Sequence, residues 1–436
     1  MRRALRNLLT LLLIALALAA LIFAPGWGLL ALLLLFGAWL LGSRAGAQSL
    51  AVTRVGLATI PERLGSSAVV IVGIGGVVGV LVALLAMAVG FQQTLRQTGT
   101  DDTVILLRAG AQTELNSVLS HETAELIEQQ PQVQHDAAGR PLASAELVVV
   151  ASLPKRSNNL DANVEIRGVD ERAWALYPNV RITTGRRFAP GLRELVVGKD
   201  AARQFKGLEL GSSLRLNGQD WSVVGTFLAN DSHDSEIWAD TSVVGSTYRR
   251  GSSTTSVTVK LTDPGALEAL RAGLAADPRL KVDAKTTRAY YSEQSQQLTR
   301  LIRILGTAVG FIMAIGAVFG ALNTMYAAVA SRGREIATLR AIGFRGGPVV
   351  VSVLIETMLL ALLGGVLGAL IAWLIFNNYT TSTLGQNFSQ VVFSFRVSPE
   401  LMWLGLKWAL AIGFVGGLYP ALHAARLPVT AGLREQ

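Results

Sequence analysis

The sequence predicts an α-helical membrane bundle that carries a large α+β domain outside the bilayer. Two observations indicate this fold class. The chain has 436 residues, of which 51% are hydrophobic, and its apolar residues gather in runs that reach the roughly 20 residues needed to cross a bilayer. Between two of these runs lie about 200 residues of ordinary soluble composition, enough for one or two compact domains. We therefore expect four core transmembrane helices, an N-terminal hydrophobic hairpin, and a large domain between core spans 1 and 2.

Charge and cysteine content exclude several classes of protein. The net charge is +9, and many of the basic residues flank apolar runs, where they orient the chain and meet anionic membrane lipid. No basic patch is interleaved with aromatic residues, so nucleic acid is not an expected partner. Cysteine is absent from the sequence, which excludes a disulfide framework and a thiolate metal site.

Residues 1–47 are expected to form the N-terminal hydrophobic hairpin. The apolar run from Leu8 to Leu41 is broken at Pro25–Gly28 and has arginines at both ends. A cleavable signal peptide is one alternative, but the run is too long for it. A single helix would be about 50 Å long and would have to tilt. We favour a thin two-helix hairpin over the tilted helix, although its arms of about 16 and 13 residues are shorter than a usual span.

The next two segments lead into the first core span. Residues 48–65 are modestly amphipathic and include Arg54 and Arg63, which favours a cytoplasmic interfacial helix over a simple linker. Residues 66–91 contain no charged side chain and are predicted to be core transmembrane helix 1. The chain therefore passes outward here.

Residues 92–297 are predicted to be the large α+β domain, with a β-rich insert at about 170–245. Alternating short strands and helices favour this class, and Asn217-Gly218 is typical of a two-residue hairpin turn. The predicted strands are Val104–Leu107, Glu146–Ala151, Leu195–Val197, Trp221–Phe227 and Ser256–Leu261, and the predicted helices are Ser120–Gln129 and Pro264–Ala275.

One polar cluster in this domain combines carboxylates with a histidine, namely Asp231, His233, Asp234 and Glu236. A metal site is conceivable from these ligand types, but we favour a solvated polar loop. The other histidines show no ligand spacing such as HExxH. No metal is therefore predicted.

The remaining segments complete the membrane bundle. A helix that continues from the polar residues before Arg303 into the apolar run would project from the bilayer as a stalk, whereas a loop followed by an ordinary span is the alternative. We predict a stalk and core helix 2 at 298–330, core helix 3 at 348–376, an outer loop at 377–399, core helix 4 at 400–422 and a cytoplasmic tail at 423–436.

Glu356 lies inside core helix 3, about two turns from its cytoplasmic end. An ionisable residue at this depth normally faces the bundle and has a partner. We favour a structural hydrogen bond or a contact near the preceding basic segment over a proton relay, because no second intramembrane acid accompanies it.

Each core helix contains two glycines four residues apart, a spacing that lets helices pack closely in lipid. The chain has 44 glycines, so such pairs also arise by chance. Together they favour a tight bundle or a close dimer seam over a wide channel. The pairs are Gly75/Gly79, Gly316/Gly320, Gly364/Gly368 and Gly413/Gly417.

The most informative stretch is the basic segment 331–347 between core helices 2 and 3, which begins SRGREIATLRAIGFR. Its four arginines indicate a cytoplasmic position. A solvated loop that only sets topology is the simpler interpretation from physics alone. If the segment is helical, one face would carry Ile336, Leu339, Ile342 and Gly343.

This segment resembles the coupling segment of the FtsX/MacB-type ABC transporter permeases, which pairs a Ser-Arg-x-x-Glu-Ile start with a Leu-Arg-Ala-Ile-Gly end. His423–Val429 resembles the family's C-terminal tail, and the turn at Lys206–Gly211 resembles the second periplasmic subdomain of the MacB and LolC/LolE branch. The resemblance covers nearly all of residues 48–436. It implies a bacterial inner (cytoplasmic) membrane protein with a large α+β periplasmic domain. The residues implied in ATPase coupling are Ser331, Arg332, Arg334, Glu335, Ile336, Leu339, Arg340, Ile342 and Gly343.

The resemblance also implies a function of the mechanotransmission type. The chain would couple ATP hydrolysis by a separate ATPase to a periplasmic conformational change that drives export or extraction of a hydrophobic substrate, such as a lipid, lipoprotein, peptide or drug. The implied partners are two copies of a cytoplasmic ABC ATPase, a second permease chain in a homodimer or heterodimer, membrane lipid, and often a periplasmic adaptor (membrane fusion) protein. The alternative is an FtsX-like transmembrane signalling subunit that regulates a periplasmic cell-wall hydrolase without transport.

The sequence gives no sign of catalysis by this chain. The Gly198-Lys199 pair lacks the following Ser or Thr of a Walker A phosphate loop, and neither a Rossmann fingerprint nor a nucleophile elbow is present. We therefore predict no catalytic residues and no cofactor on this chain, and expect the partner ATPase to bind ATP and Mg. An enzyme acting in the membrane is disfavoured because no reactive constellation appears.

Overall fold

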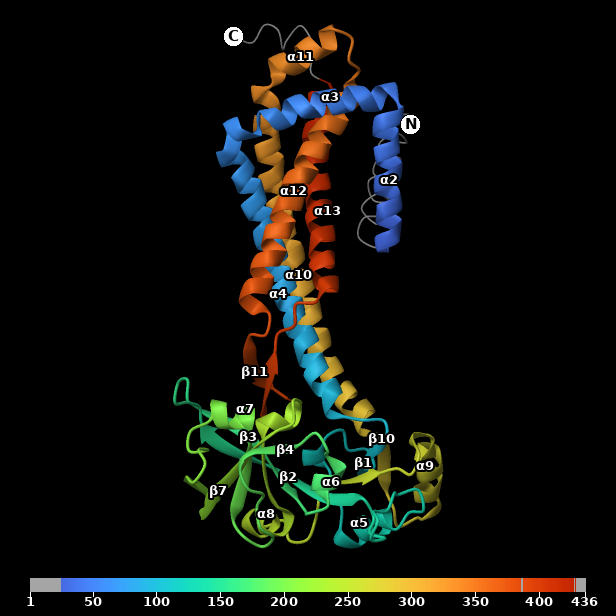
Figure 1. Ribbon diagram of the computed structural model, residues 1–436, viewed down its shortest axis with the longest axis vertical. Helices are drawn as coiled ribbons and strands as arrows, with labels where there is room; N and C mark the ends of the chain where they lie inside the picture. Colours follow the sequence, from blue (N-terminus) through green and yellow to red (C-terminus); the bar gives the residue numbers. More distant parts are fainter. Residues whose placement is uncertain (1–24, 386, 427, 429–436) are drawn as a thin grey trace. The chain divides into compact units, whose positions relative to one another are not determined.

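The computed structural model describes residues 25–385, 387–426 and 428. The chain divides into two compact units (Figure 1). One, here called the helical unit, comprises the described residues up to Met87, Leu301–Asn377 and those from Arg396 onward. The other, here called the sheet module, comprises Ala88–Arg300 and Asn378–Phe395.

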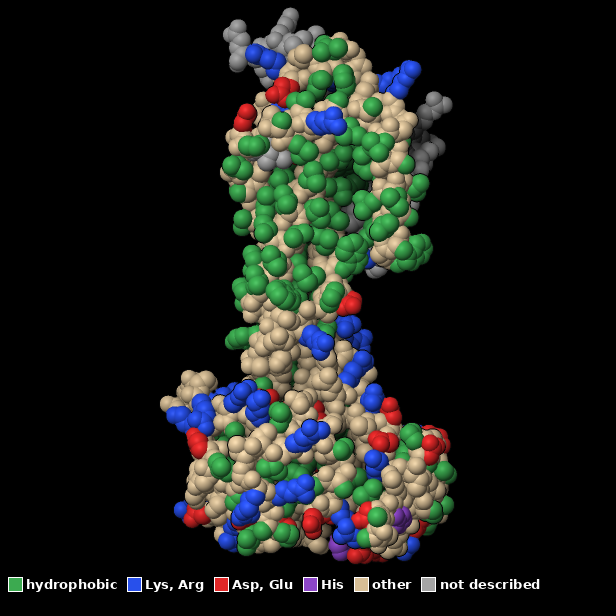
Figure 2. All heavy atoms as spheres, in the orientation of Figure 1, with side chains coloured by type: hydrophobic (Ala, Val, Ile, Leu, Met, Phe, Trp, Pro, Cys, Tyr) green, Lys and Arg blue, Asp and Glu red, His purple; other side chains and the backbone are tan. Residues whose placement is uncertain are grey.

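The helical unit contains the long apolar helices. Figure 2 shows hydrophobic side chains over most of its visible surface, as expected for helices that face lipid. Its elements are α2 (Gly26–Gly42), α3 (Arg44–Ala58), η1 (Ile60–Arg63), α4 (Leu64–Thr98), α10 (Thr287–Ser331), α11 (Gly333–Ala341), α12 (Gly346–Phe376) and α13 (Pro399–Ala424), of which α4 and α10 continue into the sheet module.

Four helices among the described residues are long and apolar enough to cross a membrane, and this confirms the predicted core spans. They are α4 with the residues just before it, α10, α12 and α13. The pair α2 and α3 would count as a fifth only as one broken span, because the two helices are bent by 95°. The first arm of the predicted hairpin lies outside the described residues, whereas α2 covers the second arm.

The predicted stalk segment is part of one unbroken helix. α10 has 45 residues and begins at Thr287, earlier than the boundary that the sequence indicated. The polar residues before Arg303 and the apolar residues after it therefore share one helix, and no loop separates them.

The sheet module is built on a ten-stranded mixed sheet in the order β10-β1-β9-β2-β3-β8-β5-β7-β4, with β6 paired to β7. The strands are β1 (Thr103–Arg108), β2 (Ala143–Pro154), β3 (Asp161–Val169), β4 (Arg181–Gly185), β5 (Glu194–Gly198), β6 (Ser213–Leu216), β7 (Gln219–Leu228), β8 (Glu236–Asp240), β9 (Ser256–Lys260) and β10 (Val282–Thr286). The helices are η2 (Glu114–Asn116), α5 (His121–Glu128), α6 (Ala173–Leu176), α7 (Lys199–Gln204), η3 (Ser232–Ser235), α8 (Thr241–Thr247), η4 (Pro264–Ala266) and α9 (Leu267–Ala276).

The predicted strands fall within or on β1, β2, β5, β7 and β9, and the predicted helices within α5 and η4–α9 and their flanks. The β6–β7 turn has positive φ at Asn217 (46°) and Gly218 (81°), as a two-residue hairpin requires. The β-rich insert does not form a separate sheet, because β8 pairs with β3 in parallel and β5 continues the same sheet.

The segment 377–399 is more than the loop that we expected. It contains a hairpin of β11 (Thr380–Leu384) and β12 (Gln390–Ser394), paired antiparallel. This hairpin connects α12 to α13 along the chain, and its residues belong to the sheet module.

Candidate functional site

The basic segment forms a short helix with a defined end. α11 runs from Gly333 to Ala341, and the backbone N–H of Phe344 donates to the carbonyl of Leu339. Gly343 has φ +109°, a conformation that a side chain would strain. The glycine therefore lets the chain turn from α11 into α12.

The nine residues implied in coupling divide between two sides of the segment. Arg332 and Ile336 are buried, and Ile336 packs in an apolar cluster with residues of α10, α12 and α13. Leu339 and Arg340 are half-buried, whereas the exposed members are Ser331, Arg334, Glu335, Ile342 and Gly343. The expectation that Ile336 and Ile342 share a face is wrong, because α11 ends before Ile342, whose side chain is 72% exposed.

A buried ion-pair triad joins this segment to two other helices. Glu356 of α12 is 2% exposed. One carboxylate oxygen accepts from Arg332 Nη1 at 3.2 Å, and the other pairs with Nη2 of Arg63, the last residue of η1 before α4. Arg332 also pairs with the exposed Glu335 through Nε at 3.2 Å. Glu356 is thus the shared buried counter-charge of two guanidinium groups, as an ionisable residue at this depth requires.

Gly56 of α3 closes over the same triad. A Cβ at this position would lie 3.0 Å from Arg332 Nη1 and 3.2 Å from Glu356 Oε2. α3, α11 and α12 therefore meet around one set of charges, and a displacement of Arg332 would act directly on the other two helices.

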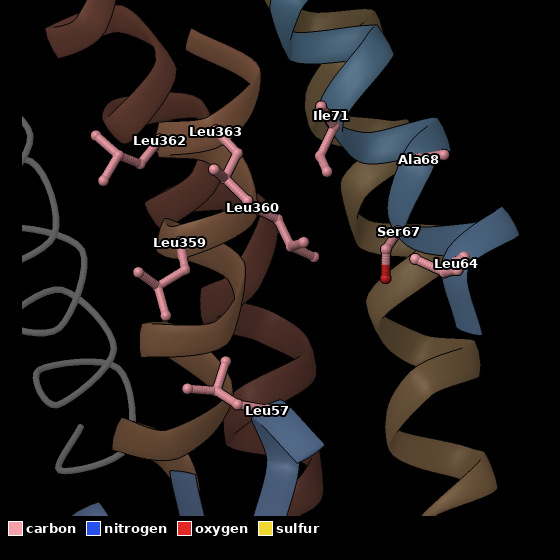
Figure 3. Close-up of a pocket in the computed structure, with 9 residues that line it drawn as sticks. All are labelled: Leu57, Leu64, Ser67, Ala68, Ile71, Leu359, Leu360, Leu362 and Leu363. Carbon is pink, nitrogen blue, oxygen red and sulfur yellow. The ribbon is translucent and has the colours of Figure 1, made fainter. Parts of the chain in front are cut away.

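Next to the triad lies an apolar cavity of about 390 Å³ between the end of α3, the start of α4 and α12 (Figure 3). Leu360 extends from α12 toward α4, and Leu57 lies at one end of the cavity. Leu57, Leu64 and Leu360 are close along the chain to Gly56, Arg63 and Glu356 respectively.

The glycine pairs have two different environments. Gly75 and Gly79 face Gly364 and Gly368, and a Cβ at Gly368 would lie 2.1 Å from the carbonyl oxygen of Gly75. α4 and α12 are therefore in close backbone contact. Gly413 and Gly417 pack on Ala361 and Thr357 of α12, whereas none of the described residues comes within 4 Å of a Cβ built at Gly316 or Gly320.

A second buried charged cluster lies in the sheet module and is centred on Arg167 of β3. This side chain is 1% exposed and pairs with four glutamates at 2.8–3.0 Å. The four are Glu114 after β1, Glu146 of β2, Glu165 of β3 and Glu236 of β8.

Glu146, Glu165 and Glu236 differ in their affinity for protons. Burial and the neighbouring Glu236 charge raise the pKa of Glu165 to about 7, against the opposing effect of Arg167. Burial likewise raises the pKa of Glu146, whereas Arg167 and His233 hold the pKa of Glu236 below its usual value despite burial. The cluster is thus a mixture of charged and proton-binding carboxylates.

The polar cluster that the sequence placed in a solvated loop is buried. Asp231, His233, Asp234 and Glu236 are each no more than 6% exposed. Burial opposes a charged His233 ring, but the Asp231 and Glu236 carboxylates outweigh it and raise its pKa to about 9. Within the described residues no three His, Cys, Asp or Glu side chains are grouped so as to hold a metal ion. The solvated-loop interpretation was wrong because these groups have partners inside the domain: His233 pairs with Asp231, Asp234 accepts from the backbone N–H groups of Ala229 and Asn230, and Glu236 pairs with Arg167.

Sequence reasoning identified Glu356 and Arg332 but not their connection through Arg63 and Gly56. Arg63 directly precedes a long uncharged run, and a basic residue at that position is usually assigned to topology alone. The Arg167 cluster was missed entirely. Apart from Glu165 and Arg167 on β3, its members are far apart in sequence, and the pairing of β3 with β2 and β8 brings Glu146 and Glu236 close to Arg167.

Comparison with known proteins matches most of the chain to two family descriptions. The MacB-like periplasmic core domain matches residues 67–277, and the FtsX-like permease C-terminal matches residues 307–429. The first match ends at residue 277, before α10 begins, and the second match begins at residue 307, inside α10.

Several curated proteins are similar in sequence. The macrolide export ATP-binding/permease protein MacB of Campylobacter jejuni is 33% identical over 31% of this chain and 20% of its own length. The macrolide export ATP-binding/permease protein MacB 1/2 of Paracoccus denitrificans is 26% identical over 67% of this chain and 45% of its own length. The uncharacterized ABC transporter permease YknZ of Bacillus subtilis is 23% identical over 84% of this chain and 93% of its own length. The chain thus spans less than half the length of these two MacB proteins.

Solved structures similar to part of this chain include two extracytoplasmic domains. The periplasmic region of MacB from Actinobacillus actinomycetemcomitans has 15% identity and a TM-score of 0.34, covering 46% of this chain and 94% of that one. The extracellular domain of YknZ from Gram-positive bacteria has 16% identity and a TM-score of 0.32, covering 42% and 100%.

Proposed function

Because the chain belongs to the FtsX/MacB-type family of ABC transporter permeases, we propose that it transmits movement from a separate ATPase to its periplasmic domain. The observation that carries this proposal is the triad of Arg332, Glu356 and Arg63. It connects a helix with an exposed outer side to the interior of the membrane bundle. Such a connection is what a docked motor needs in order to move the bundle.

The exposed side of α11 is the proposed docking surface for the ATPase. Arg334, Glu335 and Ile342 present two charges and one apolar side chain there, a combination that suits a specific protein interface. The ATPase would be cytoplasmic, would bind ATP and Mg, and would be present in two copies. Its closure would displace Arg332, and the triad would pass that displacement to α12 and α3.

α10 offers a direct route from the coupling segment toward the periplasmic domain. It ends at Ser331, next to Arg332, and begins at Thr287, inside the sheet module. A continuous helix is stiff along its axis because each residue is tied to the next turn by backbone hydrogen bonds. A push or rotation at one end of α10 would therefore reach the other end.

A second permease chain is the proposed neighbour of α10. In the most apolar part of α10 only 22% of the residues are buried, whereas 50% are buried in the corresponding part of the span that contains α4. Gly316 and Gly320 are open, and Ile312 and Phe319 are 69% and 66% exposed. Small residues beside large apolar ones suit close helix packing in lipid. The pairing would be a homodimer or a heterodimer.

We further propose the bacterial inner membrane as the location and export or extraction of a hydrophobic substrate as the outcome. The relatives named for macrolide export support this class of substrate. A periplasmic adaptor protein would fit the same scheme. An FtsX-like signalling role, in which the periplasmic domain regulates a cell-wall hydrolase, is the alternative that transport measurements would distinguish.

The docking surface can be tested with a matched pair of substitutions. Ile342→Asp changes an exposed apolar residue of the coupling segment, and Val55→Asp makes the same change on α3, where Val55 is 44% exposed. We expect Ile342→Asp to lower the amount of co-purified ATPase at least tenfold and to abolish stimulation of ATP turnover in nanodiscs. Val55→Asp should leave both unchanged. Equal binding and turnover in the two variants would refute docking at α11.

A further inference from the structure

The β11–β12 hairpin ends on a buried carboxylate of the sheet module. Asn387 Nδ2 and Ser389 Oγ both donate to Oε2 of Glu165, at 3.1 and 3.2 Å. Asn387 is 8% exposed, Ser389 3% and Glu165 6%. The three side chains are thus removed from water, and both donors are paired with Glu165 Oε2, which makes this contact costly to break.

The hairpin is also held along its length. The backbone N–H of Val392 donates to Ser235 Oγ at 2.9 Å, and Asn163 Nδ2 donates to the carbonyl of Phe388 at 2.9 Å. The Phe393 ring packs edge-on against Phe91, with centroids 5.4 Å apart. The hairpin is therefore a docked element, and its turn is only one of several attachments.

Glu165 connects the hairpin to the Arg167 cluster. Its other oxygen, Oε1, accepts from Arg167 Nη2 at 3.0 Å, while the only partners recorded for Oε2 among the described residues come from the hairpin turn. Without the hairpin, Oε1 of Glu165 would stay paired with Arg167, whereas Oε2 would lose both of these hydrogen-bond donors.

The same cluster reaches the first turns of α10. Arg167 Nη1 pairs with Glu114 Oε1 at 2.8 Å, and the backbone N–H of Glu114 donates to Tyr290 Oη at 3.2 Å. Tyr290 and Tyr291 are both buried. The Arg167 guanidinium group therefore links the N-terminal end of α10, through Glu114, with the β11–β12 hairpin, through Glu165.

We propose that Asn387 and Ser389 fasten the β11–β12 hairpin to Glu165, so that the Arg167 cluster is a second point at which the membrane helices act on the periplasmic domain. The anchoring stands on the contacts alone, and its role in coupling rests on the proposed function. α12 carries Glu356 of the triad and leads directly into the hairpin. A displacement received at Glu356 would thus reach the domain through α12 as well as through α10.

The anchoring can be measured on the full chain in nanodiscs without any ATPase. The amide of Val392 reports docking, because its partner is Ser235 of η3 and not a residue of the hairpin. We expect Asn387→Ala/Ser389→Ala to speed hydrogen exchange at Val392 at least tenfold, and Glu165→Ala to do the same. Thr380→Ala, an exposed change on the same hairpin, should leave the exchange within twofold of the unmodified chain.

The outcome is decisive because the double variant alters only the hairpin turn. If Val392 exchanges at the unmodified rate in both anchoring variants, the hairpin is held by other contacts and the proposal is overturned. Should Glu165→Ala unfold the sheet module, the double alanine variant alone gives the answer.

The coupling role needs the complex with its ATPase. We expect the ATP-driven change in hydrogen exchange of the sheet module to fall at least twofold in Asn387→Ala/Ser389→Ala, with ATPase binding unchanged. An undiminished change would exclude the second route. Faster Val392 exchange in a chain that binds no ATPase would instead uphold the anchoring and refute the proposed function.

Discussion

Nη1 of Arg332 lies 3.2 Å from Oε2 of Glu356, which ties the N-cap residue of α11 to a buried position of α12. The two residues are separated by the whole of α11 and the turn after it. The contact therefore ties the coupling segment to the helix that follows it, so that movement of the segment acts on the bundle. A basic loop that only sets topology would not need a buried partner, so this contact favours a mechanical role.

Removal of the Glu356 charge should uncouple the segment from the bundle. In Glu356→Gln, Arg332 and Arg63 lose their shared counter-charge in a buried setting, and breaking such a pair costs about 3–5 kcal/mol. We expect a lower thermal unfolding temperature in detergent and loss of ATP-turnover stimulation. Glu356→Asp should recover part of both.

Glu335→Gln is the control for the Glu356 experiment. Glu335 also pairs with Arg332, but its side chain is 47% exposed, so its removal should change stability by less than about 1 kcal/mol. Equal losses of stability in Glu356→Gln and Glu335→Gln would show that burial of the triad has no energetic importance.

Gly56→Ala should disturb the triad without removing any charge. The new Cβ would lie 3.0 Å from Arg332 Nη1, so the guanidinium group or α3 must shift by a few tenths of an ångström. We expect a several-fold decrease in coupled ATP turnover with little change in expression. Gly65→Ala provides the control, because no described residue lies within 4 Å of a Cβ at that position. The two variants should differ in turnover measured in nanodiscs, and equal turnover would argue against close packing of α3 on the triad.

Apolar run length was sufficient to predict the membrane architecture. A run of about 20 apolar residues has few alternatives to a spanning helix, and the four core spans were placed on this basis. Packing partners could not be predicted in this way. Gly316 and Gly364 are equivalent in local sequence pattern, yet of the two only Gly364 meets another helix in the part of the chain that the structure describes.

The buried charges of the sheet module show a different limit of prediction from sequence. β3 alternates Val164 and Ile166 with Glu165 and Arg167, a pattern typical of a strand with one solvated face. In the structure both faces are buried, because Arg167 pairs with Glu165 of its own strand and with three carboxylates from other elements. Sequence patterns report the chemistry of single residues, whereas this cluster depends on long-range pairing.

The two classes of glycine predict opposite results from the same substitution. Gly368→Val would force α12 away from the Gly75 carbonyl, which lies 2.1 Å from the position of a Cβ. We expect it to destabilise the monomeric chain strongly, with aggregation in detergent. Gly316→Val should leave monomer stability unchanged but weaken association with a second chain, measured by cross-linking or mass photometry. A loss of monomer stability in Gly316→Val would place this glycine inside the chain's own packing and remove the argument for a seam at α10.

The pH dependence of stability should identify Glu165 as a proton-binding group. Burial raises its pKa to about 7 in the folded chain, above the ordinary glutamate value of 4.5, so the folded state binds the proton more tightly than the unfolded state. This contribution is fully present below about pH 4.5 and is lost as the pH rises through about 7. We expect the difference in Tm between the unmodified chain and Glu165→Gln to change by a few degrees between pH 5 and 8, since about 1 kcal/mol shifts Tm by about 2–4 °C for a domain of this size. His233 and Asp234 titrate in both proteins, so their effects cancel in the difference. A difference in Tm that does not vary with pH would mean that Glu165 stays ionised in the folded domain.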